Sequence, residues 1–485
     1  MSIKVKAVRG FLWTATGTIG SGLISFLVTI ILARILGPYE FGLLEIIIVF
    51  TTISTVFIDS GFSQAIIRDN NPSQKDLSSV FFLQIAIAII IYILLFYLAP
   101  PIAHFFDANE LIPLTRFVFL TLIFDSFSLV QNANLNRQLK FKPFALASII
   151  AILLSGAIAV VMAFNNFGVW ALTSNFVLTS LLRSVLLWLQ VKWRPSFQIS
   201  SKSIQKYFKF GVNLLIQGLI DKVVSNLESI LIGRVYSKQS LGYFAQSRKF
   251  NAFLSQPTTN VVQKVTYPSL AKIADQPERL KEGYRRVIGI TMFCIAPLMI
   301  FTIVSSENFI TVVFGEKWLK SSEYLRLWAI WGVFYPVSSV YTNVFLVKGK
   351  SKLLLKISSI KQVLRIISVI MLVKIGIMPM LWGIIAVAIA STFMYTYFGG
   401  RLIMYKQREM FNDLTKTFIT SLISALMVYL TTKFILNSNY YFGFVVQLIV
   451  MVSTYFILNR FVVKNIYFFE VKEILSSLLK KNNNI

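Results

Sequence analysis

Long apolar segments without charged residues constrain this chain more than any other feature of its sequence. Ser79 to Ala99 and Phe442 to Leu458 contain no Asp, Glu, Lys or Arg, and the whole chain is 56% hydrophobic and only 14% charged. A run of about 20 apolar residues can cross the hydrocarbon core of a bilayer as an α-helix. Because helices satisfy their own backbone polar groups in lipid, the sequence predicts an all-α polytopic membrane protein.

Further runs of this kind lead us to predict about fourteen transmembrane helices. The first seven span roughly residues 11–32, 41–58, 79–99, 111–130, 143–164, 167–189 and 210–232. The second seven span roughly residues 241–265, 287–304, 324–347, 354–373, 380–400, 414–434 and 440–458.

The distribution of basic residues sets the expected orientation. The net charge is +27, and most Lys and Arg residues fall in loops and tails on one side of these spans. Clusters such as 192–209, 272–286 and 348–356 alternate with a loop around His104 that has no Lys or Arg. Positive loops stay in the cytoplasm, so we expect both termini there. Contact with anionic phospholipids explains the charge better than nucleic acid does.

A faint repeat divides the chain into two halves. The segment from Arg34 to Gly42, which includes Gly37, is echoed 234 − 34 = 200 residues later by the segment from Arg234 to Gly242. Six spans lie before the middle loop, so the halves enter the membrane in the same direction. We predict an N-lobe at 1–191, a cytoplasmic linker at 192–209, a C-lobe at 210–410, two extra helices at 411–463 and an amphipathic cytoplasmic tail at 464–485. We expect the five named Arg and Gly residues to be structural, on the hinge side of each half.

Polar side chains gather on one face of the seventh span. Asn213, Gln217, Asp221, Ser225 and Glu228 follow at helical spacing, and Lys222 lies beside them. Polar residues at membrane depth line a cavity or bind neighbouring helices, and the included charges favour a cavity here.

The eighth span carries a comparable pattern. Arg248 and Lys249 precede Asn251, Ser255, Thr259 and Gln263, while milder stripes follow Thr14, Thr18, Ser21 and Ser25 in the first span and Glu45, Thr52, Thr55 and Asp59 in the second. The alternative for the two cations is that they only reach back to the membrane surface.

Scattered charges elsewhere allow two interpretations. Arg116, Asp125, Arg183, Arg326 and Arg365 lie within other spans, and Arg365 is the deepest. Each taken alone favours an ion pair between helices or a side chain that reaches back to the membrane surface, whereas together they suit a pathway for an anionic substrate. Carboxylates at membrane depth, namely Glu45, Asp59 and Glu228, are candidates for coupling to an ion gradient.

Signatures of enzymes are missing from the sequence. It has no Gly-rich nucleotide loop, no paired His motif and a single His and Cys, His104 and Cys294. We therefore expect neither catalysis nor a cofactor or metal.

Six segments carry a resemblance to a known family, namely residues 11–13, 33–42, 59–67, 136–141, 267–270 and 314–318. In their order they resemble the Wzx-type polysaccharide flippases of the multidrug/oligosaccharidyl-lipid/polysaccharide exporter superfamily, in the branch that exports colanic and teichuronic acids. The resemblance implies two six-helix lobes arranged as a V, with spans one, two, seven and eight around a central cavity. It also implies a flippase that moves an undecaprenyl-pyrophosphate-linked oligosaccharide to the outer leaflet by alternating access.

The same resemblance suggests roles for residues and partners. By helix position, Lys222, Arg248 and Lys249 would hold the pyrophosphate, and Gln217, Asp221 and Arg365 would join them in binding substrate. A polymerase and a chain-length regulator are expected partners of a monomer. Alternatives are an ion-coupled drug or metabolite exporter of the same superfamily and a membrane polysaccharide polymerase or ligase, although no long external loop is present for the latter.

Overall fold

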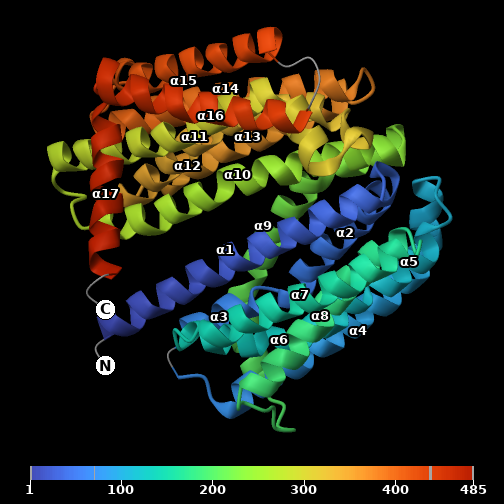
Figure 1. Cartoon of the computed structure of the whole chain (residues 1–485). Helices are drawn as coiled ribbons and strands as arrows, with labels where there is room; N and C mark the ends of the chain where they lie inside the picture. The colour runs from blue at the N-terminus through green and yellow to red at the C-terminus, as the bar shows by residue number, and fades with distance from the viewer. Residues whose placement is uncertain (1–2, 70, 436–439, 483–485) are drawn as a thin grey trace. The chain divides into compact units, whose positions relative to one another are not determined.

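The described part of the protein is helical throughout. The structure is a computed structural model that describes residues 3–69, 71–435 and 440–482, without the side chains of 3–16, 18, 256–269, 434, 435, 474, 475 and 477–482. Within these ranges the chain forms helices and short connections, with no β-strand (Figure 1). The predicted all-α polytopic membrane protein is confirmed.

The helices are listed here in chain order. The first are α1 (Ile3–Ile35), α2 (Pro38–Asp59), α3 (Phe62–Arg68), α4 (Gln74–Phe105), α5 (Leu111–Val118), α6 (Leu120–Arg137), α7 (Lys142–Phe164), α8 (Val169–Gln190) and α9 (Ser201–Val235). The others are α10 (Lys238–Ala271), α11 (Pro277–Phe314), η1 (Glu316–Trp318), α12 (Ser321–Val347), α13 (Ser351–Leu372), α14 (Ile377–Leu402), α15 (Gln407–Ile435), α16 (Tyr440–Ile457), η2 (Leu458–Val462) and α17 (Ile466–Asn482).

Each predicted span lies mainly within one of these helices, apart from the fourth, which is divided between α5 and α6. Among the described residues, ten spans are long and apolar enough to cross a membrane. The other predicted spans lie in α1, α9, α10 and α13, and α1 contributes a shorter apolar helix at Ile19–Ile35. Polar stripes were predicted in α9 and α10, and these polar residues lower the hydrophobicity of both helices.

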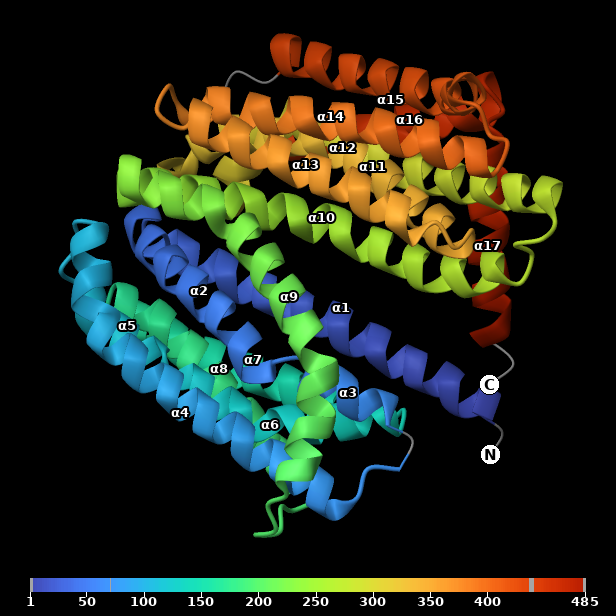
Figure 2. The same cartoon turned by 180° about the vertical axis from the view of Figure 1, so that it is seen from behind.

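The chain divides into two compact units, Met1–Ala245 and Gln246–Ile485. In the first unit, α7 packs against α1 and α8, α6 packs against α4 and α8, and α9 crosses α2 (Figure 2). These units differ from the predicted lobes, because α9 packs with the helices that precede it. The lobes were predicted from a sequence repeat, whereas the units reflect which helices pack together. The lobe boundary therefore stays a prediction.

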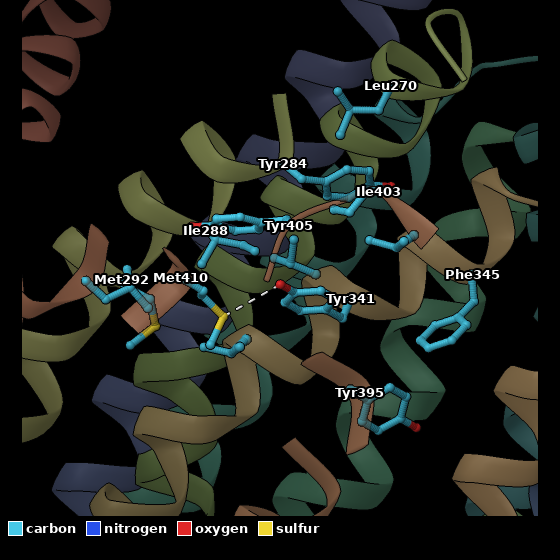
Figure 3. Close-up of a cluster of buried hydrophobic side chains, with 14 of the residues drawn as sticks. Leu270, Tyr284, Ile288, Met292, Tyr341, Phe345, Tyr395, Ile403, Tyr405 and Met410 are labelled. Atoms are coloured by element: carbon cyan, nitrogen blue, oxygen red, sulfur yellow. Dashed lines mark hydrogen bonds between the residues drawn. The ribbon is translucent and has the colours of Figure 1, made fainter. Parts of the chain in front are cut away.

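The second unit is built around an aromatic core. Helix α11 packs against α12 and α15, and α14 packs against α12 and α13. Tyr284, Tyr341, Tyr395 and Tyr405 are buried there among aliphatic side chains, and the Tyr341 hydroxyl lies 3.6 Å from the sulfur of Met410 (Figure 3). Tyrosines supply large apolar surfaces for such a core.

The predicted linker is bound tightly to the start of α4. The Gln74 amide donates to the carbonyl of Arg194 at 2.6 Å, and the backbone N–H of Ser200 donates to the Ser79 hydroxyl at 2.9 Å. Helix α9 already begins at Ser201, so the second half of the linker is helical, with the Ser200 hydroxyl as its N-cap. Lys206 and Tyr207 both bind the Asp69 carboxylate, and this contact with Lys206 holds the pKa of Asp69 below its usual range.

The two repeated segments meet within the first unit, at Gly42 and Gly242. A Cβ atom added at Gly42 would lie 1.8 Å from the carbonyl oxygen of Lys238, and one added at Gly242 would lie 1.8 Å from the carbonyl oxygen of Pro38. Pro38 and Lys238 are equivalent positions of the repeat, 238 − 38 = 200 residues apart. The contact is therefore reciprocal, as in an interface between two copies of one motif. Only glycine lets the two backbones approach this closely.

Alanine at either glycine should force these segments apart. We expect Gly42→Ala and Gly242→Ala each to lower the free energy of unfolding by about 3 kcal/mol, the upper end for overpacking, because a backbone carbonyl cannot rotate away. Thermal unfolding of the purified protein in detergent measures the effect. Gly22→Ala is the control, since a Cβ at Gly22 would meet nothing within 4 Å. Equal midpoints for Gly42→Ala and Gly22→Ala would contradict the expectation.

Candidate functional site

The polar stripe of α9 lies on an exposed face of the helix. Asn213, Gln217, Asp221 and Ser225 are all exposed, at successive intervals of four residues. Lys222 is exposed beside them, whereas Val224 and Asn226 on the other side of the helix are buried. A membrane helix thus presents amide, hydroxyl, carboxylate and ammonium groups along one side without burying them in its own unit.

Glu228 departs from this exposed face and is fully buried, with 0% of its surface accessible. Glu45 of α2 is also buried, and the Ser229 hydroxyl donates to its carboxylate at 3.1 Å. One turn earlier on α9, the Asn226 amide lies 3.4 Å from the Thr52 hydroxyl of α2. Both glutamates are predicted for coupling, and the structure buries both, with Glu45 in a polar contact between α2 and α9.

Asp59, the third predicted coupling residue, lies at the end of α2 next to the turn into α3. Its carboxylate accepts from the backbone N–H of Ser63 at 3.1 Å and also from the Ser63 hydroxyl. Since α3 begins at Phe62, these bonds satisfy a donor in its first turn. Asp59 therefore has a local structural role, and its coupling role stays a prediction.

The polar face of α10 is different, because its described members pack inside the second unit. Ser247, Asn251 and Ser255 are buried. The Ser247 hydroxyl donates to the Ser321 carbonyl at 2.8 Å, and the Asn251 amide oxygen lies next to Gly332 of α12. Ser247 and Asn251 thus contact α12 rather than open space, and the Ser255 hydroxyl donates to the Asn251 carbonyl of its own helix. Thr259 and Gln263 lie outside the described side chains.

The two cations of α10 point away from that packed face. Lys249 is exposed and Arg248 is partly exposed.

The polar stripe of the first span is described only in part. Thr14 and Thr18 lie outside the described side chains, and the Ser21 hydroxyl donates to the Gly17 carbonyl within the same helix. In α13, Arg365 is partly exposed, and Lys361, which the sequence analysis missed, lies one turn before it. Their spacing of four residues could have indicated a shared face.

Most of the scattered charges have partners within their own unit. Arg183 of α8 binds Asp125 of α6 at 2.6 Å, and the Ser180 hydroxyl also contacts Asp125. Arg326 binds Glu307, and the Arg116 guanidinium lies 4.1 Å from the centre of the Phe96 ring. The interpretation as ion pairs between helices is confirmed for Arg183 with Asp125 and for Arg326 with Glu307.

The predicted hinge residues occupy helix ends. Arg234 lies at the end of α9, and its guanidinium binds Asp107 at 2.6 Å and the Phe105 carbonyl at 2.7 Å. Gly37 is the N-cap of α2, and its N–H donates to the Glu40 carboxylate at 2.9 Å. Arg34 is exposed in the last turn of α1. These contacts fix the turns that bring Gly42 and Gly242 together.

Among the described side chains, no group of three His, Cys, Asp or Glu residues is placed to hold a metal ion.

Comparison with known proteins identifies relatives and a fold. Residues 31–323 match the family model described as "Polysaccharide biosynthesis protein". The chain is 25% identical to "Teichuronic acid biosynthesis protein TuaB" of Bacillus subtilis (strain 168), over 73% of each chain. It is 24% identical to "Lipopolysaccharide biosynthesis protein WzxC" of Escherichia coli (strain K12), over 76% of each chain.

Among solved structures, the fold is similar to that of the "Lipid II flippase MurJ", with a TM-score of 0.76. The match covers 93% of this chain and 98% of that chain at 18% sequence identity, so it concerns the fold alone.

Removing one member of the Arg183–Asp125 pair should destabilise the first unit. Arg183→Met leaves a half-buried carboxylate without its cation, which we expect to cost about 2 kcal/mol of unfolding free energy. Arg326→Met is the matched control and should cost less than about 1 kcal/mol, because the pair with Glu307 is more exposed. Thermal unfolding in detergent compares the two variants, and a larger loss for Arg326→Met would contradict the ranking.

Proposed function

The chain belongs to the polysaccharide biosynthesis protein family, and from that premise we propose that it is a flippase for undecaprenyl-pyrophosphate-linked oligosaccharides. It moves the saccharide from the inner to the outer leaflet of the bacterial cytoplasmic membrane, for the synthesis of cell-surface polysaccharide. The observation that carries the proposal is the exposed polar face of α9, formed by Asn213, Gln217, Asp221 and Ser225. A transmembrane helix with such a face needs a polar occupant or water beside it.

The chemistry of this face suits a sugar head group. Saccharide hydroxyls and a diphosphate cannot cross hydrocarbon alone, because they would lose hydration without replacement hydrogen bonds. The amide of Gln217 and the carboxylate of Asp221 provide donors and acceptors for hydroxyl groups. Lys222, Arg248 and Lys249 bind the diphosphate, because cations form their strongest hydrogen bonds with phosphate oxygens. Arg365 adds a further cation from α13, while the prenyl chain stays in the lipid.

Coupling to an ion gradient is assigned to Glu45 and Glu228. Their burial supports this, because ionisable groups at membrane depth are costly and are found along ion pathways. A change in the charge of Glu45 would alter how α9 packs on α2, because Glu45 accepts a hydrogen bond from Ser229 of α9.

Alternating access would then use the contact between Gly42 and Gly242 as its pivot. Both glycines touch backbone atoms of the equivalent repeat segment, which is the geometry of a pivot between two similar halves. In this proposal the protein is a monomer with both termini in the cytoplasm, and it lies among anionic phospholipids. Its protein partners are a polymerase and a chain-length regulator.

Loss of the cations should stop transport. We expect Lys222→Gln, Arg248→Gln and Lys249→Gln each to reduce flipping at least about tenfold, because each removes a charge-assisted bond to the diphosphate. The measurement is the fraction of lipid-linked saccharide that remains on the inner leaflet of cells that produce it.

Lys75→Gln is the matched control, since Lys75 is an exposed cation at the start of α4, away from the polar stripe of α9. Normal export by all three cation variants would refute the assignment, and a defect in the control would show that overall charge, not the stripe, is responsible.

Neutral replacements of the buried carboxylates should separate transport from coupling. In proteoliposomes, Glu45→Gln and Glu228→Gln should still move substrate down its own gradient but lose the acceleration given by an imposed proton or sodium gradient. Glu323→Gln, at an exposed site of α12, is the control. Full acceleration in both carboxylate variants would disprove the coupling role.

A further inference from the structure

A wide basic pocket lies at one end of the second unit, where α11, α15 and α17 meet. Its volume is about 700 Å³. Its charged lining comprises Arg279, Glu282, Arg285 and Arg286 from α11, Asp413 and Lys416 from α15, Lys464 from the turn before α17, and Glu470 from α17. Basic residues outnumber carboxylates, so the pocket carries a net positive charge.

Two of the cations hold the walls of the pocket together. Arg286 binds Glu470 at 3.1 Å, which ties α17 to α11. Arg285 binds Asp413, which ties α15 to α11 and holds the pKa of Arg285 above its usual range. The Tyr405 hydroxyl donates to the same Asp413 carboxylate at 2.7 Å. Arg285 and Arg286 therefore already bind carboxylates within the protein.

The other cations are Arg279, Lys416 and Lys464, and they remain available for a ligand. No carboxylate of a described residue lies within 4.0 Å of any of them. Among the described side chains, the Arg279 guanidinium donates a hydrogen bond only to the side-chain amide oxygen of Gln276, at 3.0 Å. Like charges that line one pocket repel one another, and an anion between them would remove that cost.

Lys464 is positioned by a strained backbone. Its φ of 48° is in the left-handed region, which is uncommon for a residue with a side chain. The buried Asn465 holds this turn, because its amide donates to the Thr417 hydroxyl at 3.1 Å and to the Asn459 side-chain oxygen at 3.0 Å. Strain of this kind persists where the surroundings enforce it, and it is frequent at ligand sites.

The tail helix closes the pocket through a close contact with α11. Tyr467 is buried, and a Cβ atom at Gly289 would lie 2.0 Å from its ring. The ring therefore fits only because residue 289 is glycine, and burial raises the pKa of Tyr467 to about 12. Figure 1 shows α17 crossing the ends of the other helices of its unit. An amphipathic helix in that direction lies along the membrane surface, which places the pocket at the level of lipid head groups.

We propose that this pocket binds a phosphate-bearing anionic group through Arg279, Lys416 and Lys464, and that the bound anion strengthens the docking of α17. The site is separate from the polar face of α9 and does not depend on the function proposed above. The phosphate has two possible sources, the head group of an anionic phospholipid and a soluble phosphorylated compound. Basic pockets between membrane helices bind anionic head groups by the same chemistry.

The test compares two triple variants that remove the same charge. The pocket variant is Arg279→Gln, Lys416→Gln and Lys464→Asn, with Asn chosen because it tolerates the left-handed conformation. The control variant is Lys350→Gln, Lys352→Gln and Lys356→Gln, three exposed cations near the start of α13. Native mass spectrometry measures retained phosphatidylglycerol, and thermal unfolding measures stabilisation by inorganic pyrophosphate.

In the lipid case, wild type and control retain phosphatidylglycerol and the pocket variant binds it at least about fivefold more weakly. In the soluble case, pyrophosphate raises the unfolding midpoint of wild type and control but not of the pocket variant, and lipid retention is equal in all three. Equal retention and equal midpoint shifts in both variants would overturn the proposal. If the pocket variant does not fold, Lys416→Gln alone, at an exposed side chain, replaces it under the same criteria.

Discussion

The arrangement of the first unit depends on the backbone contact between Gly42 and Gly242. The start of α2 and the start of α10 touch there without side chains between them. Helices without large side chains at their crossing can approach closely, and in a membrane such packing replaces the hydrophobic effect as the source of association. Gly211 continues this pattern, because a Cβ there would lie 2.1 Å from the Ser60 carbonyl oxygen, so α9 also lies close to the end of α2.

That close packing determines where polar groups can go. A buried polar atom in a membrane protein must find a partner, so Glu45 accepts from Ser229 and Asp125 binds Arg183. Gln217 and Asp221 lie on the exposed side of α9, where water or a substrate can take the place of a protein partner. On the buried side of α9, polar side chains bind other helices and stabilise the fold. On its exposed side, polar side chains are accessible to a substrate.

Sequence patterns predicted the helices well, because the length of an apolar run is a local property. They could not predict which neighbour a polar face meets. Asn251 and Ser255 follow the same spacing as Gln217 and Asp221, yet both are buried and Asn251 packs against α12, since the identity of the facing helix is a tertiary property. The basic pocket was missed for the same reason: Arg279, Lys416 and Lys464 are far apart in sequence and meet only through the docking of α17. The repeat, in contrast, pointed to Gly42 and Gly242 because both copies of the motif retain the glycine.

The pivot role of this glycine contact is tested most directly by distances between spin labels, with Cys294→Ala as background. One pair of labels replaces Tyr39 and Gln239, beside the contact, and a second pair replaces Lys140 and Lys272, in the basic loops of the two halves. Pulsed electron paramagnetic resonance with and without lipid-linked saccharide should give one narrow, unchanged distance for the first pair and a shifted distribution for the second. A shift at Tyr39 and Gln239 as large as that at Lys140 and Lys272 would contradict a pivot at Gly42 and Gly242.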